Sequence, residues 1–443
     1  MKRLITQKLI DWKNYPQKKP LFVCGARQVG KTTSIFTFAA EHYSNVVMLN
    51  FEGNEPLQQI FIKDFDPRRI ITELKNLTGK SITKGDTLIF FDEIQECPKA
   101  ITSLKYFYEQ EPELHIIAAG SLLGVALNRN LKYKKGEMQT SGISFPVGKV
   151  TPMTFYPMNF CEFLMQVNPH MLEIIEECFT TDKPMPNALH QKALEFYRIF
   201  LFTGGMPRAV QEYSLGNESD FVRLAQTEIL SLYYSDMSKY SGKSEQVKIN
   251  SVYNSIPFQL AKENRKFQYS VIGSGARAAS YEIGLHWLRY AGLIIQVNKV
   301  YEGKYPLVSF TDALSYKVYM NDVGLLNAKS NVSHSRIIGE SVADETRGAM
   351  AENYVAAELA ANSIIPFYWE SEGKAELNFV AQLGDESIPI EVKSAIRTQS
   401  KSLNVYMDKY KPKYAIRISA KNFGFENNIK SVPLYAVWCA GLV

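Results

Sequence analysis

The sequence predicts an α/β fold, with a parallel sheet in its first third and a helical segment after it. In the first third, short apolar runs alternate with helical patterns, at residues 21–24, 46–49, 88–91 and 116–119. None of these runs alternates between apolar and polar residues, as a strand with one solvated face would. They are therefore expected to be parallel strands that are buried on both faces.

The chain has the composition of a soluble globular protein. Its 443 residues, 46% apolar and 21% charged, provide for two to four domains of ~100–200 residues each. The longest nearly apolar run, around 116–127, is interrupted by Gly and Ser and falls short of the ~20 residues that cross a bilayer. The N-terminus lacks the apolar core and cleavage site of a secretory signal. We therefore expect a cytoplasmic protein with no membrane partner.

The five cysteines form no pattern typical of a metal site or a disulfide framework. They are widely spaced and include no C-x-x-C pair, and the six histidines include no H-E-x-x-H motif. We therefore expect neither structural zinc nor disulfide bonds.

Polar stretches mark the seams of the chain, at 181–187, 241–245 and 327–335. We expect four domains, with the bounds 1–165, 166–242, 243–330 and 336–443, the second of them a helical lid or linker. The third holds eleven Lys and Arg against six Asp and Glu, a surplus equal to the net charge of +5 of the whole chain. The positive charge is thus concentrated in one region, although it is too small to identify a nucleic-acid binder by itself.

A glycine-rich segment directly follows the first predicted strand and precedes a helix. It reads Gly25, Ala26, Arg27, Gln28, Val29, Gly30, Lys31, Thr32 and Thr33, and its first eight residues match the phosphate-binding pattern G-x-x-x-x-G-K-[ST]. Gly25 and Gly30 allow the backbone to curl so that its N–H groups and the helix N-terminus face a phosphate. Lys31 then reaches the β- and γ-phosphates, and Thr32 offers its hydroxyl to Mg²⁺. The alternative is a glycine turn without a ligand, but the order of strand, motif and helix favours binding of ATP and Mg²⁺.

The predicted strand at 88–91 ends in two carboxylates, Asp92 and Glu93. At the carboxyl edge of a parallel sheet, such a pair can supply a hard oxygen ligand to Mg²⁺. We expect Asp92 to hold the metal through water and Glu93, together with Lys31, to act in catalysis by polarising the attacking water and stabilising the phosphate charge. An acidic pair after an apolar run is common, and the upstream phosphate motif is what favours the hydrolase interpretation.

Two further features of the predicted site stay open. Ser121 follows the run at 116–119 and can be a sensor residue beside the attacking water or a simple strand-ending turn. An arginine from a neighbouring subunit often stabilises the transition state of such enzymes. Arg198, Arg208 and Lys149 are candidates for that role, so a homo-oligomer is one expectation.

With these motifs the chain resembles a prokaryotic family of predicted AAA+-type P-loop ATPases, which join an N-terminal ATPase domain to a C-terminal region with a restriction-endonuclease-like end. The matching segments are 25–32, 91–95, 203–207, 288–293, 319–325 and 352–355. The resemblance implies an AAA+-type domain over 1–165, a winged helix over 243–330 and an α/β nuclease-like domain over 336–443. Where the family often has Gly-Arg, this chain has Gly148 and Lys149, which puts a catalytic arginine there in doubt.

The residues of the basic region support the implied winged helix. Segments 251–261 and 278–290 have helical patterns, and a β-wing begins at 294. On this interpretation Arg277 and Arg289 flank or lie on the recognition helix, where arginine contacts phosphates or guanine edges of DNA. Winged helices also dock proteins, so a protein partner is the alternative.

The implied nuclease end contains a predicted hairpin with polar residues on one face. Alternation along its strands groups Glu376 with Asn378, and Glu391 with Lys393, while Glu352 lies on the preceding helix. In restriction-type nucleases such carboxylates hold Mg²⁺ and the lysine helps to activate water. The family usually has Asp where this chain has Asn378, and an amide is a poor ligand for a hard cation. We therefore expect a nuclease-like fold that is retained for DNA or partner binding.

Three functions remain open from the sequence. The leading hypothesis is an ATP-driven switch that is coupled to DNA through its C-terminal domains. The alternatives are an ATP-regulated DNA nuclease, and a signalling or remodelling ATPase that binds proteins and no nucleic acid.

Overall fold

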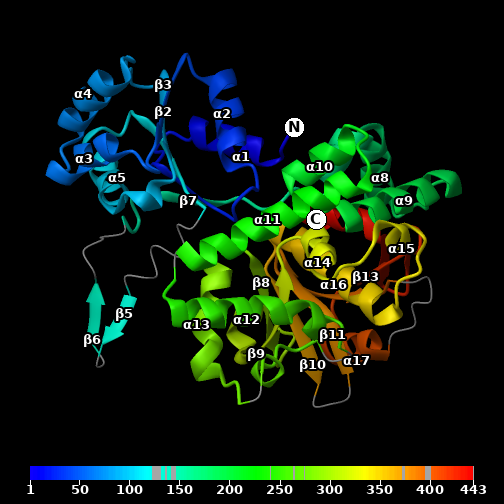
Figure 1. The fold of residues 1–443 in the computed structure, drawn as a ribbon. Coiled ribbons are helices and arrows are strands. Elements are labelled where there is room, and N and C mark those ends of the chain that lie inside the picture. Colours follow the sequence, from blue (N-terminus) through cyan, green and yellow to red (C-terminus); the bar gives the residue numbers. More distant parts are fainter. Residues whose placement is uncertain are drawn as a thin grey trace. The chain divides into compact units, whose positions relative to one another are not determined.

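The computed structural model describes residues 1–121, 131–134, 137–140, 146–239, 241–262, 265–273, 275–371, 375–394 and 401–442. The chain divides into two compact units (Figure 1). The N-terminal unit is Lys2–Phe155 with Tyr290–Gly292, and the C-terminal unit is Tyr156–Arg289 with Leu293–Val443. The four-domain division stays a prediction. No helix in the described ranges is long and apolar enough to cross a membrane.

The N-terminal unit is built on a five-stranded parallel sheet with the order β2-β3-β4-β1-β7. Its strands are β1 (Leu21–Cys24), β2 (Asn45–Asn50), β3 (Thr87–Asp92), β4 (His115–Ala119) and β7 (Thr151–Thr154). The predicted parallel sheet is therefore confirmed, and a fifth strand, β7, extends it beside β1. Strands β3 and β4 are buried along their whole length, as their unbroken apolar runs require.

Helices surround this sheet and leave its carboxyl edge to loops. They are α1 (Ile5–Asn14), α2 (Lys31–His42), α3 (Glu55–Lys63), α4 (Pro67–Thr78), α5 (Pro98–Gln110) and the 3₁₀ turn η1 (Ile94–Glu96), and strands β5 (Leu131–Lys134) and β6 (Glu137–Thr140) form a separate ribbon. The core includes Phe51, Phe61 and Phe91, whose rings meet edge to face with centroids 5.4–5.6 Å apart. This packing fixes β3 against the helical layer and so fixes the position at which β3 ends.

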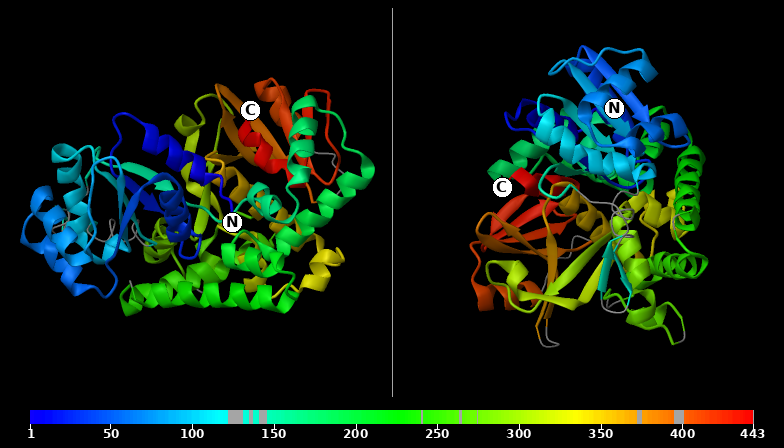
Figure 2. Two further views of the ribbon diagram at one scale, coloured as in Figure 1. Left: turned by 90° about the horizontal axis from the view of Figure 1, so that it is seen from above. Right: turned by 90° about the vertical axis from the view of Figure 1, so that its left-hand side faces the viewer.

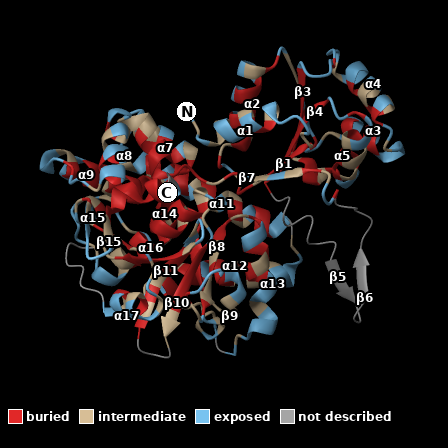
Figure 3. Ribbon diagram, turned by 180° about the vertical axis from the view of Figure 1, so that it is seen from behind, coloured by how far each residue is buried: buried red, intermediate tan, exposed pale blue. Residues whose placement is uncertain are grey.

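The C-terminal unit contains an eight-stranded mixed sheet with the order β14-β15-β13-β12-β11-β10-β8-β9. Its strands are β8 (Ile294–Val300), β9 (Thr311–Met320), β10 (Pro366–Ser371), β11 (Ala375–Leu383), β12 (Glu386–Val392), β13 (Ala415–Ser419), β14 (Gly424–Glu426) and β15 (Ile429–Pro433). Figure 2 shows these strands, from yellow-green to red, with helices of the same unit beside them. Figure 3 shows that the buried residues of each unit gather in the strands and on the helix faces that pack against them.

The helices of this unit come mainly before the sheet in the chain. They are α7 (Phe160–Val167), α8 (His170–Thr181), α9 (Asn187–Thr203), α10 (Pro207–Ser214), α11 (Ser219–Lys239), α12 (Lys243–Leu260), α13 (Ala278–Tyr290), α14 (Val323–Lys329), α15 (His334–Ile338), α16 (Asp344–Ala361) and α17 (Lys401–Tyr410), with the 3₁₀ segments η2 (Tyr269–Val271), η3 (Leu307–Phe310) and η4 (Leu434–Leu442). Glu358 of α16 accepts a hydrogen bond from Phe160 N at 2.8 Å, and burial raises the pKa of this carboxyl to about 8. A buried carboxyl thus accepts a hydrogen bond from a backbone N–H at the start of α7 that has no partner within the helix.

The predicted winged helix is not confirmed as a separate domain. Helix α13 covers the predicted segment 278–290, and β8 begins at the predicted residue 294. However, β8 pairs in parallel with β10 as well as antiparallel with β9, so the predicted wing is part of the eight-stranded sheet. Pairing between strands so distant in the sequence leaves no signal in the local pattern.

Three of the family-like segments, 203–207, 319–325 and 352–355, meet in the interior of the C-terminal unit. The Asp322 carboxylate accepts hydrogen bonds from Gly205 N at 2.6 Å and Leu325 N at 2.8 Å. Burial raises the pKa of Asp322 to about 6, although these N–H groups favour its charged form. A Cβ atom on Gly205 would lie only 1.8 Å from Met158 O, so no larger residue fits there. These segments therefore have a packing role.

Candidate functional site

The loop after β1 is bent by residues with left-handed backbone conformations. Gly25 has φ 144°, Gln28 φ 67° and Gly30 φ 88°. A Cβ atom on Gly25 would lie 2.3 Å from Phe155 O, so both the conformation and the space require glycine there. Gly30 is the N-cap of α2, and the free N–H groups at the start of that helix favour an anion.

Lys31 is the first residue of α2 and is only 7% exposed. Its ammonium group donates hydrogen bonds to Gly25 O at 2.9 Å and to Ala26 O at 2.8 Å. Burial lowers the pKa of Lys31 to about 8, and the nearby charges of Glu93 and Asp92 oppose that shift. Neutral carbonyl groups of the loop thus accept the hydrogen bonds of a poorly solvated ammonium group. An anionic ligand can replace these carbonyl groups as the acceptor.

Thr32 and Asp92 join the start of α2 to the end of β3. Thr32 Oγ1 donates to Asp92 Oδ2 at 3.1 Å, and the backbone N–H of Glu93 donates to Asp92 Oδ1 at 3.1 Å. Burial and the charge of Glu93 raise the pKa of the Asp92 carboxyl. A hydroxyl beside a buried carboxylate is a set of hard oxygen donors, so these two residues fit a Mg²⁺ ion.

Glu93 lies where the chain turns sharply after β3, with φ 49°. Its carboxylate accepts hydrogen bonds from Gln95 Nε2 and, at 3.4 Å, from Ser121 Oγ. Strand β4 lies between β1 and β3, and for this reason Ser121, the second residue after β4, can reach Glu93. Gln95 belongs to the matched segment 91–95, but its role could not be predicted, because only the turn after β3 brings its uncharged amide to Glu93.

The predicted nuclease residues also come together, in the C-terminal unit. Hairpin β11–β12 carries Glu376, Asn378 and Glu391, and Lys393 follows β12. Lys393 Nζ lies 2.8 Å from Glu391 Oε1, and Val392 N donates to Asn378 Oδ1 at 2.9 Å. The predicted grouping of these residues on one hairpin is therefore observed.

Basic residues neutralise the carboxylates of this group. Glu352 Oε1 accepts from Arg265 and from Asn378 Nδ2, and its Oε2 accepts from the Tyr319 hydroxyl at 3.0 Å. Lys317, only 1% exposed, places its Nζ 2.5 Å from Glu376 Oε1 and 3.9 Å from Glu352 Oε2. Among the described residues, no group of three or more His, Cys, Asp or Glu side chains could hold a metal ion. With these side-chain positions, the group does not fit a catalytic Mg²⁺.

The predicted DNA-contacting residues are exposed. Arg277 immediately precedes α13 and Arg289 lies in its last turn, so they are at opposite ends of the helix. The guanidinium of Arg289 lies 3.5 Å from Gln296 Oε1 and 3.3 Å from His286 Nδ1. Both arginines are open to solvent, as a DNA contact requires.

The three candidates for a transition-state cation all have acidic partners. Arg198 pairs with Glu340, Arg208 with Glu228, and Lys149 with Glu109 at 3.0 Å. A cation that acts across a subunit boundary would have to leave such a partner, and these pairs give no reason to prefer one candidate.

Residues 17–164 match the model of a family described as an AAA domain. The N-terminal unit is an AAA-type P-loop ATPase domain. Its parallel sheet, its glycine-bent loop after β1 and its carboxylate pair after β3 agree with that assignment. An AAA domain of this type binds a nucleotide and usually Mg²⁺, and Lys31, Thr32 and Asp92 are suitably placed to hold them.

The other two family matches lie almost entirely in the C-terminal unit, and their descriptions give no function. Residues 194–336 match a domain of unknown function (DUF8612), and residues 347–437 match another (DUF4143). No curated protein matches the chain. The restriction-endonuclease-like assignment of the C-terminal end is thus not confirmed.

Solved structures similar to the chain include three archaeal proteins. The Walker-type ATPase PABY2304 of Pyrococcus abyssi is 15% identical, with a TM-score of 0.40 over 73% of this chain and 94% of its own. The Aeropyrum pernix ORC1 protein in complex with DNA is 13% identical, with a TM-score of 0.26 over 76% and 92%. Cdc6p from Pyrobaculum aerophilum is 13% identical, with a TM-score of 0.24 over 77% and 96%. At these TM-scores the alignments do not establish a common fold for the whole chain.

Proposed function

We propose that the protein is an Mg-ATP-dependent switch in which the AAA domain hydrolyses ATP and its nucleotide state controls the C-terminal unit. Residues 25–33 bind the phosphates, with Lys31 on the β- and γ-phosphates. Thr32 and Asp92 hold Mg²⁺, which neutralises phosphate charge when bound. Glu93 accepts a proton from the attacking water, and Ser121 and Gln95 orient its carboxylate.

The observation that carries this proposal is the setting of Glu93. Its two hydrogen-bond donors, Gln95 and Ser121, are neutral, and among the described residues no cation forms a salt bridge with it. Neutral donors orient a carboxylate without balancing its charge, which suits a residue that positions the attacking water. It lies on the residue next to Asp92, so a water beside the bound metal is within its reach.

Phosphate release from ATP tests the proposal on the wild type and on Lys31→Ala, Glu93→Gln and Glu41→Gln. Glu41 is an exposed carboxylate on α2, so its variant is a matched control. We expect Lys31→Ala to lose both binding and turnover, Glu93→Gln to lose turnover while it retains nucleotide, and the control to remain active. Equal turnover in all four proteins would disprove the assignment of these residues.

A coupling to DNA through Arg277 and Arg289 is the second part of the proposal. The exposure of both arginines and the positive charge of region 243–330 support it. In gel shifts across a salt series, we expect affinity that falls steeply with salt and is weakened by Arg277→Ala and Arg289→Ala. Arg68→Ala, at an exposed position in the AAA domain, should bind as the wild type does. Absence of binding even at low salt would favour a protein partner.

Cleavage of DNA is not favoured by the pairing of Glu352 and Glu376 with Arg265 and Lys317. We propose that the nuclease-like hairpin has a structural or binding role. Plasmid DNA incubated with Mg²⁺ or Mn²⁺ is then expected to stay intact. Nicking by the wild type that disappears in Lys393→Ala would establish the nuclease alternative instead.

A further inference from the structure

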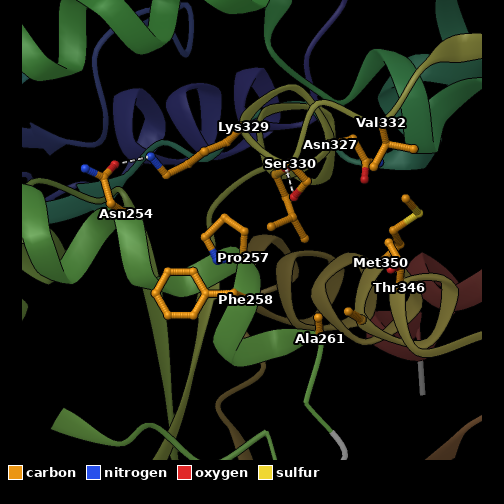
Figure 4. A pocket seen from close by; sticks show the side chains of 12 residues that line it. Asn254, Pro257, Phe258, Ala261, Asn327, Lys329, Ser330, Val332, Thr346 and Met350 are labelled. Carbon is orange, nitrogen blue, oxygen red and sulfur yellow. Dashed lines mark hydrogen bonds between the residues drawn. The ribbon is translucent and has the colours of Figure 1, made fainter. Parts of the chain in front are cut away.

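A cavity of about 420 Å³ lies within the C-terminal unit, between α12, the end of α14 and α16 (Figure 4). Its size is within the range of ~300–1,000 Å³ that is typical of small-molecule sites. All of its lining residues belong to this unit, so it is independent of the proposed nucleotide site.

Lys329 is the one lining residue of this cavity, among those described, that carries a formal charge. Its ammonium group donates to Asn254 Oδ1 at 2.6 Å and to the Tyr234 hydroxyl, and the Tyr253 ring centroid lies 4.5 Å away. These partners are neutral, so none of them balances the charge of the ammonium group. Burial lowers the pKa of Lys329 to about 8, and in the described part of the chain no neighbouring carboxylate opposes that shift.

Asn327, a second polar residue of the lining, adds no group that a ligand could reach. It is almost completely buried, and its Nδ2 donates to Leu201 O at 2.5 Å. Its Oδ1 has almost no accessible surface and no hydrogen-bond partner among the described residues, so it lies in the packed interior behind the wall. The charge of Lys329 therefore carries the expected recognition of a ligand.

The rest of the wall is mostly apolar. Phe258, Leu326 and Met350 contribute to it, and Figure 4 shows the Phe258 ring and the Met350 side chain on different sides of the cavity. An apolar wall with a few converging polar groups is the usual form of a small-molecule site. We propose that the cavity binds a small organic carboxylate that has an apolar body.

The nucleotide site of the same chain supports this interpretation. Lys31, like Lys329, is held by neutral oxygen acceptors. Lys317, in contrast, lies in an internal cluster and pairs with a carboxylate. Lys329 thus resembles in its surroundings the lysine that we propose to bind phosphate, and this comparison rests on the proposed function.

Titration of the full-length protein with N-acetyl-L-leucine tests the proposal by calorimetry. This probe has the carboxylate and an apolar side chain, and its amide derivative has the same body without the charge. We expect the acid to bind about 10-fold more tightly than the amide, or better. Lys329→Met should reduce affinity for the acid to that for the amide. Lys413→Met, at an exposed lysine, should have no effect.

A second variant separates loss of the cavity from loss of the charge. Ala261 lies on the wall and is half-buried, so Ala261→Phe fills the cavity while it keeps Lys329. It should weaken binding of both probes. No binding of the acid to the wild type, equal binding of acid and amide, or full binding by Ala261→Phe would each overturn the proposal. Should Lys329→Met fail to fold, the comparison of the two probes on the wild type decides.

Discussion

Two groups of charged residues in this chain use the same residue types in opposite ways. In the AAA domain, buried Lys31 is hydrogen-bonded to carbonyl groups, and Asp92 and Glu93 accept hydrogen bonds from neutral donors. In the C-terminal unit, buried Lys317 pairs with Glu376, and Arg265 pairs with Glu352. The first arrangement leaves its charges to be balanced by a ligand, whereas the second balances them internally. Partners, rather than residue types, therefore distinguish a ligand site from a structural cluster.

The largest expected effect is the difference in stability between two variants, each of which lacks one buried lysine. Both are compared in the absence of nucleotide. Lys317→Met leaves Glu376 without its partner, and because the Glu376 side chain is one-third exposed, the loss for the C-terminal unit should be ~2–4 kcal/mol, below that of a fully buried pair. Lys31→Met removes a poorly solvated charge that forms no salt bridge among the described residues. The free energy of unfolding of its unit should therefore be almost unchanged. Urea unfolding of both variants measures the difference. Similar losses of stability in the two variants would contradict the proposed difference between an internally balanced cluster and a ligand site.

A smaller loss of stability is expected from Asn378→Asp. The Asn378 amide donates to Glu352 and also accepts from Val392 N at 2.9 Å, and a carboxylate can keep only the second bond. The new charge would also face Glu352, so we expect a loss of ~1–3 kcal/mol. Thermal unfolding measures it, with Asn404→Asp at an exposed position of α17 as the control. A rise in stability on addition of Mg²⁺ would show instead that the substitution restores a metal site.

The pKa of Lys31, about 8 without ligand, predicts a pH dependence of nucleotide binding. The protonated amine pairs with phosphate, and a bound triphosphate raises its pKa. Affinity for ATP should therefore be greatest below pH 8 and fall as the pH rises above it. Binding of a fluorescent ATP analogue between pH 6.5 and 9.5 measures this, and Lys31→Ala should show a flat profile over the alkaline range. A flat profile in the wild type would contradict the prediction.

Ser121→Ala should have the smallest effect. It removes one hydrogen bond to Glu93, at 3.4 Å, from a side chain that does not touch Lys31 or Asp92 in the described contacts. We expect turnover to fall by about 2–10-fold with unchanged affinity for ATP. Steady-state kinetics with a separate binding titration makes the distinction. Unchanged turnover would favour the alternative of a simple strand-ending turn.

The sequence predicts the AAA domain well because its features are local. The glycine-bent loop and the strand that ends in Asp92 are each encoded within fewer than ten consecutive residues. The charge balance in the C-terminal unit is different, because Arg265 and Lys317 reach Glu352 from distant positions in the chain. No spacing rule identifies such partners, and neither basic residue was singled out in advance. Gln95 was missed for another reason, since only the turn after β3 brings it to Glu93.

The position of β4 determines the width of the nucleotide site. Because β4 separates β1 from β3, the loop that carries Gly25 and the carboxylate pair emerge about 9.5 Å apart, two interstrand distances. A directly adjacent pair of strands would leave half that width, too little for a phosphate chain and a hydrated ion side by side. The intervening strand is thus a spacer, and Ser121, the second residue beyond its end, reaches the carboxylate of Glu93 across the space that the strand provides.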